Sequence, residues 1–146
     1  MKTVVVDASY AGAWMLPDEH SDEAERLLKA AFAGQVALAA PELWHYEMCN
    51  LLAMAMRRGR IGEAQALEGM ELIGAMPIDF HDHHGNLPRR RVLLLAARFS
   101  LSAYDAAYLE LADRLQCPLQ TNDDALRAAA AQLGLPVLLR GIAGGP

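Results

Sequence analysis

Short apolar runs that alternate with longer helical stretches constrain the fold of this chain more than any other feature. The first run, Thr3–Val6, is β-branched, which is typical of a strand that is buried on both faces. Four more short runs follow, each separated from the last by segments with helical periodicity. Because parallel strands need crossover connections, this order predicts βαβ units and a parallel sheet with helices on both faces.

The periodicity also predicts where the elements lie. The segment Glu42–Arg58 is apolar on nearly every side, so we expect its helix to be largely buried. Strands are expected at Thr3–Val6, Val36–Ala39, Pro77–Phe80, Pro118–Gln120 and Pro136–Leu139, before a frayed tail at Gly141–Pro146. Helices are expected from Asp18 or Ser21 to Phe32, and at Glu42–Arg58, Arg60–Ala75, Arg89–Phe99, Ser102–Leu115 and Asp123–Gln132.

Length and composition fit a single domain, residues 1–146. A chain near this length buries about 68–70% of its unfolded surface, and 53% of the residues are apolar, so a full core needs no disulfide or structural metal. The apolar stretch before Asp7 is too short for a secretion signal, and no run reaches the ~18–20 residues of a membrane span. We therefore expect a soluble, cytoplasmic protein. Cys49 and Cys117 lack metal-binding spacing, and we expect both thiols to be buried.

Two acidic residues follow predicted strands, at the edge of a parallel sheet where ligands bind. Asp7 follows Val4–Val6, and Asp123 comes shortly after Pro118–Gln120. Each has a structural alternative, since Asp is a common helix N-cap. At the second position the cap could come instead from Thr121 paired with Asp124, which would leave Asp123 free to face the strand ends.

Two more acidic residues lie on predicted helices. Glu47 shares a stripe of the Glu42–Arg58 helix with Asn50. A buried carboxylate without a partner costs several kcal/mol, so Glu47 should be paired with an arginine, protonated or bound to a metal. Asp105 lies in the first turn of the next-to-last helix, where Ser102 and Asp105 resemble a capping box. The core stripe of that helix is expected to contain Leu101, Tyr104, Tyr108, Leu111 and Leu115.

Together the four acids predict a metal site. If they converge at about 6 Å, each pair repels by roughly 3 kcal/mol at an effective dielectric constant near 20. Protons or a divalent cation must then neutralise them, and an all-oxygen ligand set selects Mg²⁺ or Mn²⁺ over zinc. Such a cation polarises a phosphoryl oxygen and generates hydroxide from water, which is the chemistry of phosphodiester hydrolysis. The candidate catalytic and metal-binding residues are Asp7, Glu47, Asp105 and Asp123.

The chain resembles the PIN-domain family, and most closely its VapC-type toxins, in four segments that occur in the same order. They are V-V-V-D-A-S at 4–9, A-P-E-L-W-x-x-E-x-x-N at 40–50, L-S-A-Y-D-A-A-Y-L-E-L-A at 101–112 and P-L-x-T-N-D-x-x-L at 118–126. The resemblance spans nearly the whole chain and implies a Rossmann-like α/β/α sandwich. It also implies a metal-dependent endoribonuclease toxin that forms a homodimer and is inhibited by a VapB-type antitoxin.

The resemblance also assigns residues. Asp7, Glu47, Asp105 and Asp123 match the acidic metal positions of the family, and Ser9, Asn50 and Thr121 match polar positions that often accompany them. Asp124 directly follows Asp123, so spacing alone does not decide which of the two faces the metal. The segment His81–Arg91 matches no motif of the family.

Binding of RNA requires local positive charge, because the net charge of the chain is −5. Two arginine clusters are candidates, since the guanidinium group engages phosphate oxygens with paired hydrogen bonds. The alternative is that both clusters are solvated helix ends. The clusters are Arg57, Arg58 and Arg60, and Arg89, Arg90 and Arg91.

Two other functions remain open. The run His81-Asp82-His83-His84 could belong to a zinc hydrolase, although no second cluster completes such a site. A non-catalytic PIN-like interaction module would keep the fold without the chemistry. It would leave the repulsion among four retained acids without a purpose.

Overall fold

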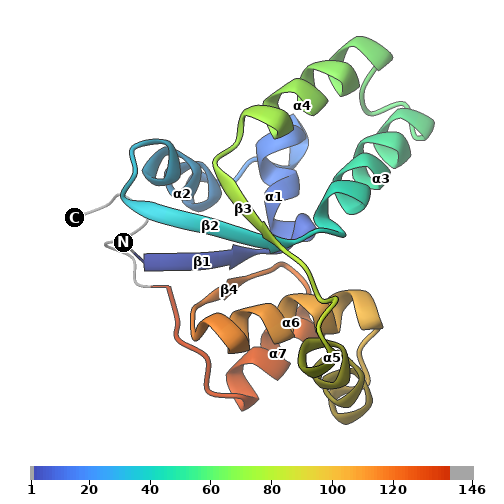
Figure 1. The fold of residues 1–146 in the computed structure, drawn as a ribbon. Coiled ribbons are helices and arrows are strands. Elements are labelled where there is room, and N and C mark those ends of the chain that lie inside the picture. Colours follow the sequence, from blue (N-terminus) through green and yellow to red (C-terminus); the bar gives the residue numbers. More distant parts are fainter. Residues whose placement is uncertain (1, 139–146) are drawn as a thin grey trace.

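The computed structural model describes residues 2–138 as a four-stranded sheet with helices on both faces (Figure 1). The strands are β1 (Lys2–Val6), β2 (Val36–Pro41), β3 (Ile78–His81) and β4 (Leu119–Gln120), all parallel and in the order β3-β2-β1-β4. The helices are α1 (Ala8–Met15), α2 (Asp22–Phe32), α3 (Trp44–Arg57), α4 (Glu63–Ala75), α5 (Asn86–Phe99), α6 (Ala103–Leu115) and α7 (Asp124–Gln132), with a 3-10 turn η1 (Pro17–Glu19). The predicted α/β fold is confirmed.

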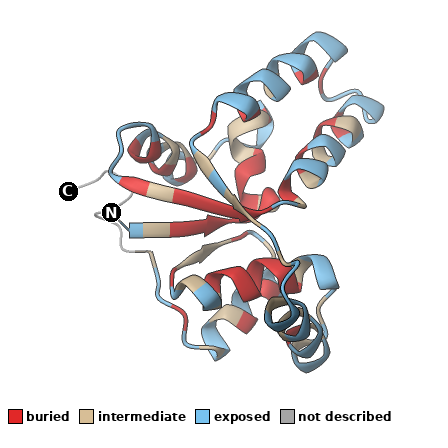
Figure 2. Cartoon of the chain, in the orientation of Figure 1, coloured by how far each residue is buried: buried red, intermediate tan, exposed pale blue. Residues whose placement is uncertain are grey.

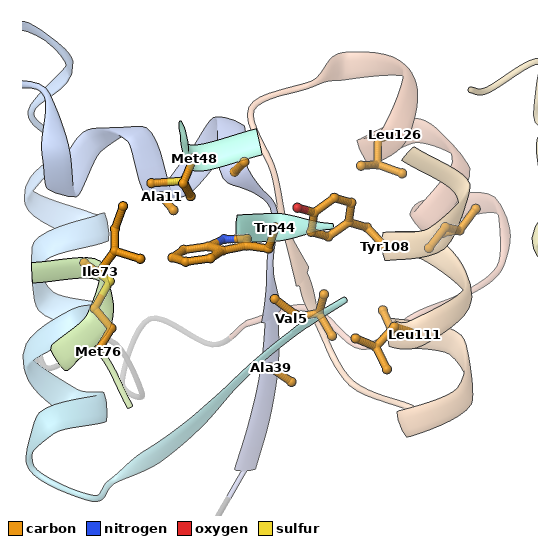
Figure 3. Packing of buried hydrophobic residues seen from close by; sticks show 14 of the residues in the cluster. Val5, Ala11, Ala39, Trp44, Met48, Ile73, Met76, Tyr108, Leu111 and Leu126 are labelled. Atoms are coloured by element: carbon orange, nitrogen blue, oxygen red, sulfur yellow. The ribbon is translucent and has the colours of Figure 1, made fainter. Parts of the chain in front are cut away.

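Strand β1 shows why Val4–Val6 contains no polar residue. Successive side chains of a strand point to opposite faces of the sheet. Val5 packs in one core cluster with Trp44 and Tyr108 (Figure 3), whereas Val4 and Val6 pack in a second cluster with residues of α2. Both faces of β1 are therefore covered, and all three valines are fully buried.

Helix α6 is the central helix of the larger cluster. It packs against β1, β2, α5 and α7, and Figure 2 shows it buried along most of its length. Among residues 2–138, no single helix is long and apolar enough to cross a membrane. Helices α5 and α6 reach that length and composition only as a pair, and they are bent by 114° at the break between them.

Several predicted boundaries differ from the structure. Helix α1 was not predicted, because it has only eight residues and contains Gly12. A Cβ atom at Gly12 would lie 3.2 Å from a methyl group of Leu51, so glycine allows α1 to approach α3 closely. Helix α5 begins at Asn86 rather than at Arg89, since Pro88 falls in the first turn, where its missing N–H is not needed. Helix α4 begins at Glu63, because the chain is still in a turn at Arg60 and Ile61.

The prediction of a fifth strand is wrong as far as the structure describes it. Residues 136–138 form no strand, and Leu139 and the predicted tail Gly141–Pro146 lie outside the described residues. Pro136 has no N–H to donate to a ladder, and the neighbouring β4 has only two residues in its own ladder.

Three predictions of burial are also wrong. Helix α3 is not buried all round, because it packs through one side, formed by Trp44, Met48, Leu52 and Ala55, and leaves Cys49 exposed. Cys117 is buried as expected. Tyr104 is exposed rather than part of the core. It lies in the first turn of α6, one turn before the buried Tyr108.

Candidate active site

Asp7 lies where β1 ends and α1 begins, and its carboxylate is held by two hydroxyl groups. Ser9 Oγ donates to Oδ2 at 2.8 Å and Thr121 Oγ1 donates to the same oxygen at 2.6 Å. Asp7 is only 4% exposed, and its side chain makes no capping hydrogen bond to α1. Its position is therefore that of an N-cap, but the carboxylate is oriented by the two hydroxyls and not by the helix.

The β4–α7 turn completes this arrangement from the other end of the chain. Asn122 donates from its backbone N–H to Ser9 Oγ and from Nδ2 to the carbonyl oxygen of Ser9, both at 3.0 Å. Thr121 Oγ1 also accepts from the N–H of Asp123 at 3.0 Å. The structure thus brings Ser9 and Thr121 together as predicted. Sequence reasoning missed Asn122, whose signal was its place between Thr121 and Asp123.

Glu47 lies on the flank of α3 and is half-buried. The hydroxyl of Tyr108 donates to its Oε1 at 2.6 Å. Burial raises the pKa of Glu47, the Tyr108 hydrogen bond opposes that rise, and repulsion from Asp7 and Asp105 adds to it. Burial and the neighbouring negative charge of Glu47 raise the pKa of Tyr108, which therefore stays a neutral donor. The sequence placed Tyr108 in the core stripe and gave no sign of this contact.

Asp105 lies in the first turn of α6. Ser102 caps that helix by accepting the N–H of Asp105 at 3.1 Å, so the cap does not use the Asp105 carboxylate. Burial raises the pKa of Asp105, and repulsion from Asp7 and Asp123 raises it further. Asp105 is therefore within electrostatic reach of both acids that follow strands.

Asp123 and Asp124 have different roles. Asp123 is the N-cap of α7, where Oδ1 accepts the N–H of Leu126 at 2.8 Å. Asp124 is exposed and forms an ion pair with Arg127 at 3.2 Å. The predicted cap by Thr121 and Asp124 is wrong, because Asp123 supplies it. Repulsion from Asp123 contributes to the raised pKa of Asp105, after burial and repulsion from Asp7.

No basic residue within residues 2–138 forms an ion pair with Asp7, Glu47, Asp105 or Asp123. The predicted alternative of an arginine partner for Glu47 is therefore wrong for this part of the chain. A cluster of carboxylate oxygens without protein cations fits the ligand chemistry of Mg²⁺ or Mn²⁺.

The four carboxylates are spread more widely than ligands around one ion. In the part of the chain that the structure describes, the only three His, Cys, Asp or Glu side chains with ligand atoms all within 4.8 Å of one another are His20, Asp22 and Glu25. The four acids therefore need side-chain rotation or bridging waters to share a cation. Asn50 lies one turn after Glu47 and is exposed on α3.

In the two arginine clusters, one residue lies well away from Glu47 and two are bound by acids outside the site. Arg57 follows Glu47 by ten residues of one helix, about 15 Å along its axis. Arg60 is bound by Asp18 at 2.6 Å and Glu19 at 3.3 Å, and Arg91 is bound by Asp113. Among the described residues, the other four predicted arginines form no ion pair. They are Arg57, Arg58, Arg89 and Arg90.

One histidine of the run at the end of β3 contacts a buried carboxylate rather than a cluster of metal ligands. His83 Nε2 lies 2.8 Å from Oε2 of the buried Glu110, which Arg114 also binds at 3.0 Å. No three ligand atoms of this run cluster within the described residues. Within the described residues, the histidine run therefore does not supply the ligands that a zinc hydrolase would need.

Comparison with known proteins agrees with this arrangement. The family model described as "PIN domain" matches residues 4–132. Ribonuclease VapC3 of Pyrobaculum aerophilum is 32% identical over 120 residues, which are 82% of this chain and 88% of that protein. Ribonuclease VapC9 of Mycobacterium tuberculosis H37Rv is 32% identical over 120 residues, or 82% and 85%.

A solved structure supports the fold. The crystal structure of PAE2754 from Pyrobaculum aerophilum superimposes with a TM-score of 0.66 and 23% identity. The superposition covers 92% of this chain and 91% of PAE2754.

Proposed function

The chain belongs to the PIN-domain family, and we propose that it is the toxin endoribonuclease of a VapBC-type toxin–antitoxin pair, which hydrolyses RNA phosphodiester bonds with Mg²⁺ or Mn²⁺. The observation that carries this proposal is the group of four acids without a cationic partner among residues 2–138. They come from the end of β1, from α3, from α6 and from the β4–α7 turn, and burial together with repulsion between them raises the pKa of Glu47 and Asp105.

We assign the cation to Asp7, Glu47, Asp105 and Asp123, directly or through water. When bound, the cation polarises a phosphoryl oxygen and lowers the pKa of water. Ser9 and Thr121 fix one oxygen of Asp7, and Tyr108 fixes one oxygen of Glu47. These three hydroxyls reduce the rotation of the ligands, as hydrogen bonds behind metal ligands do in other proteins. Asn50 is the polar neighbour of Glu47 on the exposed side of α3.

The proposed partners follow from the proposed role. An antitoxin of the VapB type would cover the acidic site, and RNA would be the substrate, met in the cytoplasm. We also propose a homodimer, for which α5 offers exposed leucines, since large exposed apolar patches mark protein interfaces. These are Leu87, Leu93 and Leu94, which are 71%, 69% and 59% exposed.

A cleavage assay on single-stranded RNA tests the proposal. We expect cleavage with Mg²⁺ or Mn²⁺, none with EDTA, and a loss in Asp123→Asn, where asparagine keeps the N-cap of α7 but removes the charge. Asp124→Asn is the matched control, because Asp124 is the exposed neighbour paired with Arg127, and it should cleave like the wild type. Equal effects at the two positions, or no metal-dependent cleavage, would contradict the proposal and favour a non-catalytic interaction module.

A further inference from the structure

Tyr104 is a large aromatic side chain that the fold leaves uncovered beside the acidic site. It is 67% exposed, whereas Tyr108, one turn later on α6, is fully buried. The Tyr104 hydroxyl has no hydrogen bond to any residue within 2–138, and the ring has no aromatic or cationic neighbour there. Nothing in the described fold therefore explains why this position carries a ring.

The position of Tyr104 fixes its relation to the site. It directly precedes Asp105 in the first turn of α6, and Tyr108 lies four residues after it on the same row of the helix. The Cβ atoms of such a pair are about 6 Å apart. Because Tyr104 precedes Asp105 and shares a row of α6 with Tyr108, whose hydroxyl touches Glu47, we infer that Tyr104 lies at the rim of the acidic site.

Charge considerations indicate what such a ring would contribute. The acidic site and a net charge of −5 oppose the approach of an RNA backbone. Of the predicted arginines, Arg57 is more than two helical turns from Glu47, and Arg60 and Arg91 are held in ion pairs with other acids. Beyond the charge of a bound cation, contacts that do not depend on phosphate charge would add affinity for RNA next to the site. Stacking of a base on an aromatic ring is such a contact.

We propose that Tyr104 is a substrate-binding residue whose ring stacks on a base next to the scissile phosphate of single-stranded RNA. This inference rests on the proposed function, since it assumes that RNA reaches the acidic site. It assigns Tyr104 to binding and leaves the chemical step to the acids.

A series of substitutions tests the ring itself. Tyr104→Phe and Tyr104→Trp keep a π face, whereas Tyr104→Leu keeps an exposed apolar side chain without one. Binding is measured in the Asp7→Asn background, so that the RNA stays intact, with a short single-stranded RNA that carries 2-aminopurine. We expect Tyr104→Leu to weaken binding by about 5- to 150-fold, the range for loss of one stacked base, and to reduce quenching of 2-aminopurine. Tyr104→Phe should bind like the parent.

Two further readouts separate stacking from other roles. The loss in Tyr104→Leu should be the same factor at low and high salt, because stacking releases no counterions, whereas loss of a phosphate contact lowers the salt slope. In the otherwise wild-type enzyme, Tyr104→Leu should raise KM and leave kcat nearly unchanged. Tyr46 is the matched control: it is 81% exposed and lies on the side of α3 opposite Trp44 and Met48, so Tyr46→Leu should change neither quantity.

The outcomes are distinguishable. Unchanged affinity in Tyr104→Leu, an equal loss in Tyr46→Leu, or a change of oligomeric state without a change in RNA affinity would overturn the inference, the last by assigning Tyr104 to a protein interface. If the wild type cleaves no RNA, the proposed function fails by itself, and binding in the Asp7→Asn background still reports on the ring. If the wild type cleaves and Tyr104→Leu binds like the parent, only the inference about Tyr104 fails.

Discussion

Two of the three carboxylates of helix α6, Asp105 and Glu110, have opposite surroundings. Glu110 is 3% exposed and lies between Arg114 and His83, and although burial opposes the effect, these partners lower its pKa. Asp105 has no cationic partner among residues 2–138, and burial and the charges of Asp7 and Asp123 raise its pKa. The protein balances one carboxylate internally and leaves the other unbalanced. A charge that the fold keeps without compensation is a sign of function, because it fits an external cation.

The largest expected difference between the two carboxylates is in RNA cleavage. Asp105→Asn should reduce the cleavage rate by more than about 100-fold, since loss of residues that only orient metal ligands already costs 10–100-fold. Glu110→Gln should cleave at the wild-type rate per folded molecule. Initial rates on the same RNA, with folded protein quantified by circular dichroism, measure this. A similar loss in both variants would remove the distinction.

The next effect concerns the hydroxyl behind Asp7. Thr121→Val keeps the shape of a buried side chain but removes the hydrogen bonds to Asp7 Oδ2 and from the N–H of Asp123. We expect a 10–100-fold loss of cleavage and of Mn²⁺ affinity, the usual range for a residue that orients a metal ligand. Thr121→Ser keeps the hydroxyl and is the matched control. Retained activity in Thr121→Val would show that Ser9 alone orients Asp7.

The third effect is on stability. Here replacement of Glu110 is expected to have the larger effect, whereas replacement of Asp105 has the larger effect on cleavage. Glu110→Ala leaves Arg114 and His83 without their buried partner, and loss of one partner of a buried pair costs about 3–5 kcal/mol. Arg114 is one-third exposed, so water compensates part of this, and we expect about 2 kcal/mol and a Tm about 4–8 °C lower. Asp105→Ala should not lower the Tm by a comparable amount. Thermal unfolding without divalent cations measures both variants.

The smallest effect is the pH dependence of stability, and its sign differs between the two carboxylates. The lowered pKa of Glu110 means that its stabilisation is present above its unfolded pKa of about 4.3 and is lost as the pH falls through its folded pKa. The raised pKa of Asp105 means that its destabilisation is present above its folded pKa and disappears below its unfolded pKa of about 3.9.

Glu110→Gln should therefore lower stability at pH 7 but not at pH 3, and Asp105→Asn should raise it slightly at pH 7 but not at pH 3. Chemical denaturation in EDTA at a series of pH values checks this. If both substitutions changed the free energy of unfolding at pH 7 in the same direction, the proposed difference between the two carboxylates would be contradicted.

Much of the fold and part of the site were predictable from local patterns. The apolar run before Asp7 and the Thr121–Asp124 turn mark strand ends, and parallel strands bring such ends to one edge of the sheet. The structure joins Asp7, Ser9 and Thr121 by hydrogen bonds, and their roles at a metal stay predictions. Helix α1 was not predicted, because eight residues with a central glycine show little helical periodicity.

Contacts between elements that are distant in the sequence were harder to predict. The hydrogen bond from Tyr108 to Glu47 joins residues 61 positions apart, and no local pattern indicates that a tyrosine of a core stripe turns its hydroxyl toward another helix. The exposure of Cys49 and Tyr104 depends on which helices cover α3 and α6, which is a property of the assembled fold. The local pattern likewise did not decide whether Thr121 with Asp124 or Asp123 caps α7.

Titration with Mn²⁺, followed by electron paramagnetic resonance, tests most directly whether the four acids form one cation site. The wild type should bind Mn²⁺, and Asp7→Asn, Glu47→Gln, Asp105→Asn and Asp123→Asn should each weaken binding by at least about 10-fold, whereas Asp124→Asn and Glu110→Gln should bind like the wild type. No binding at millimolar Mn²⁺, or binding that none of the four substitutions weakens, would contradict the account.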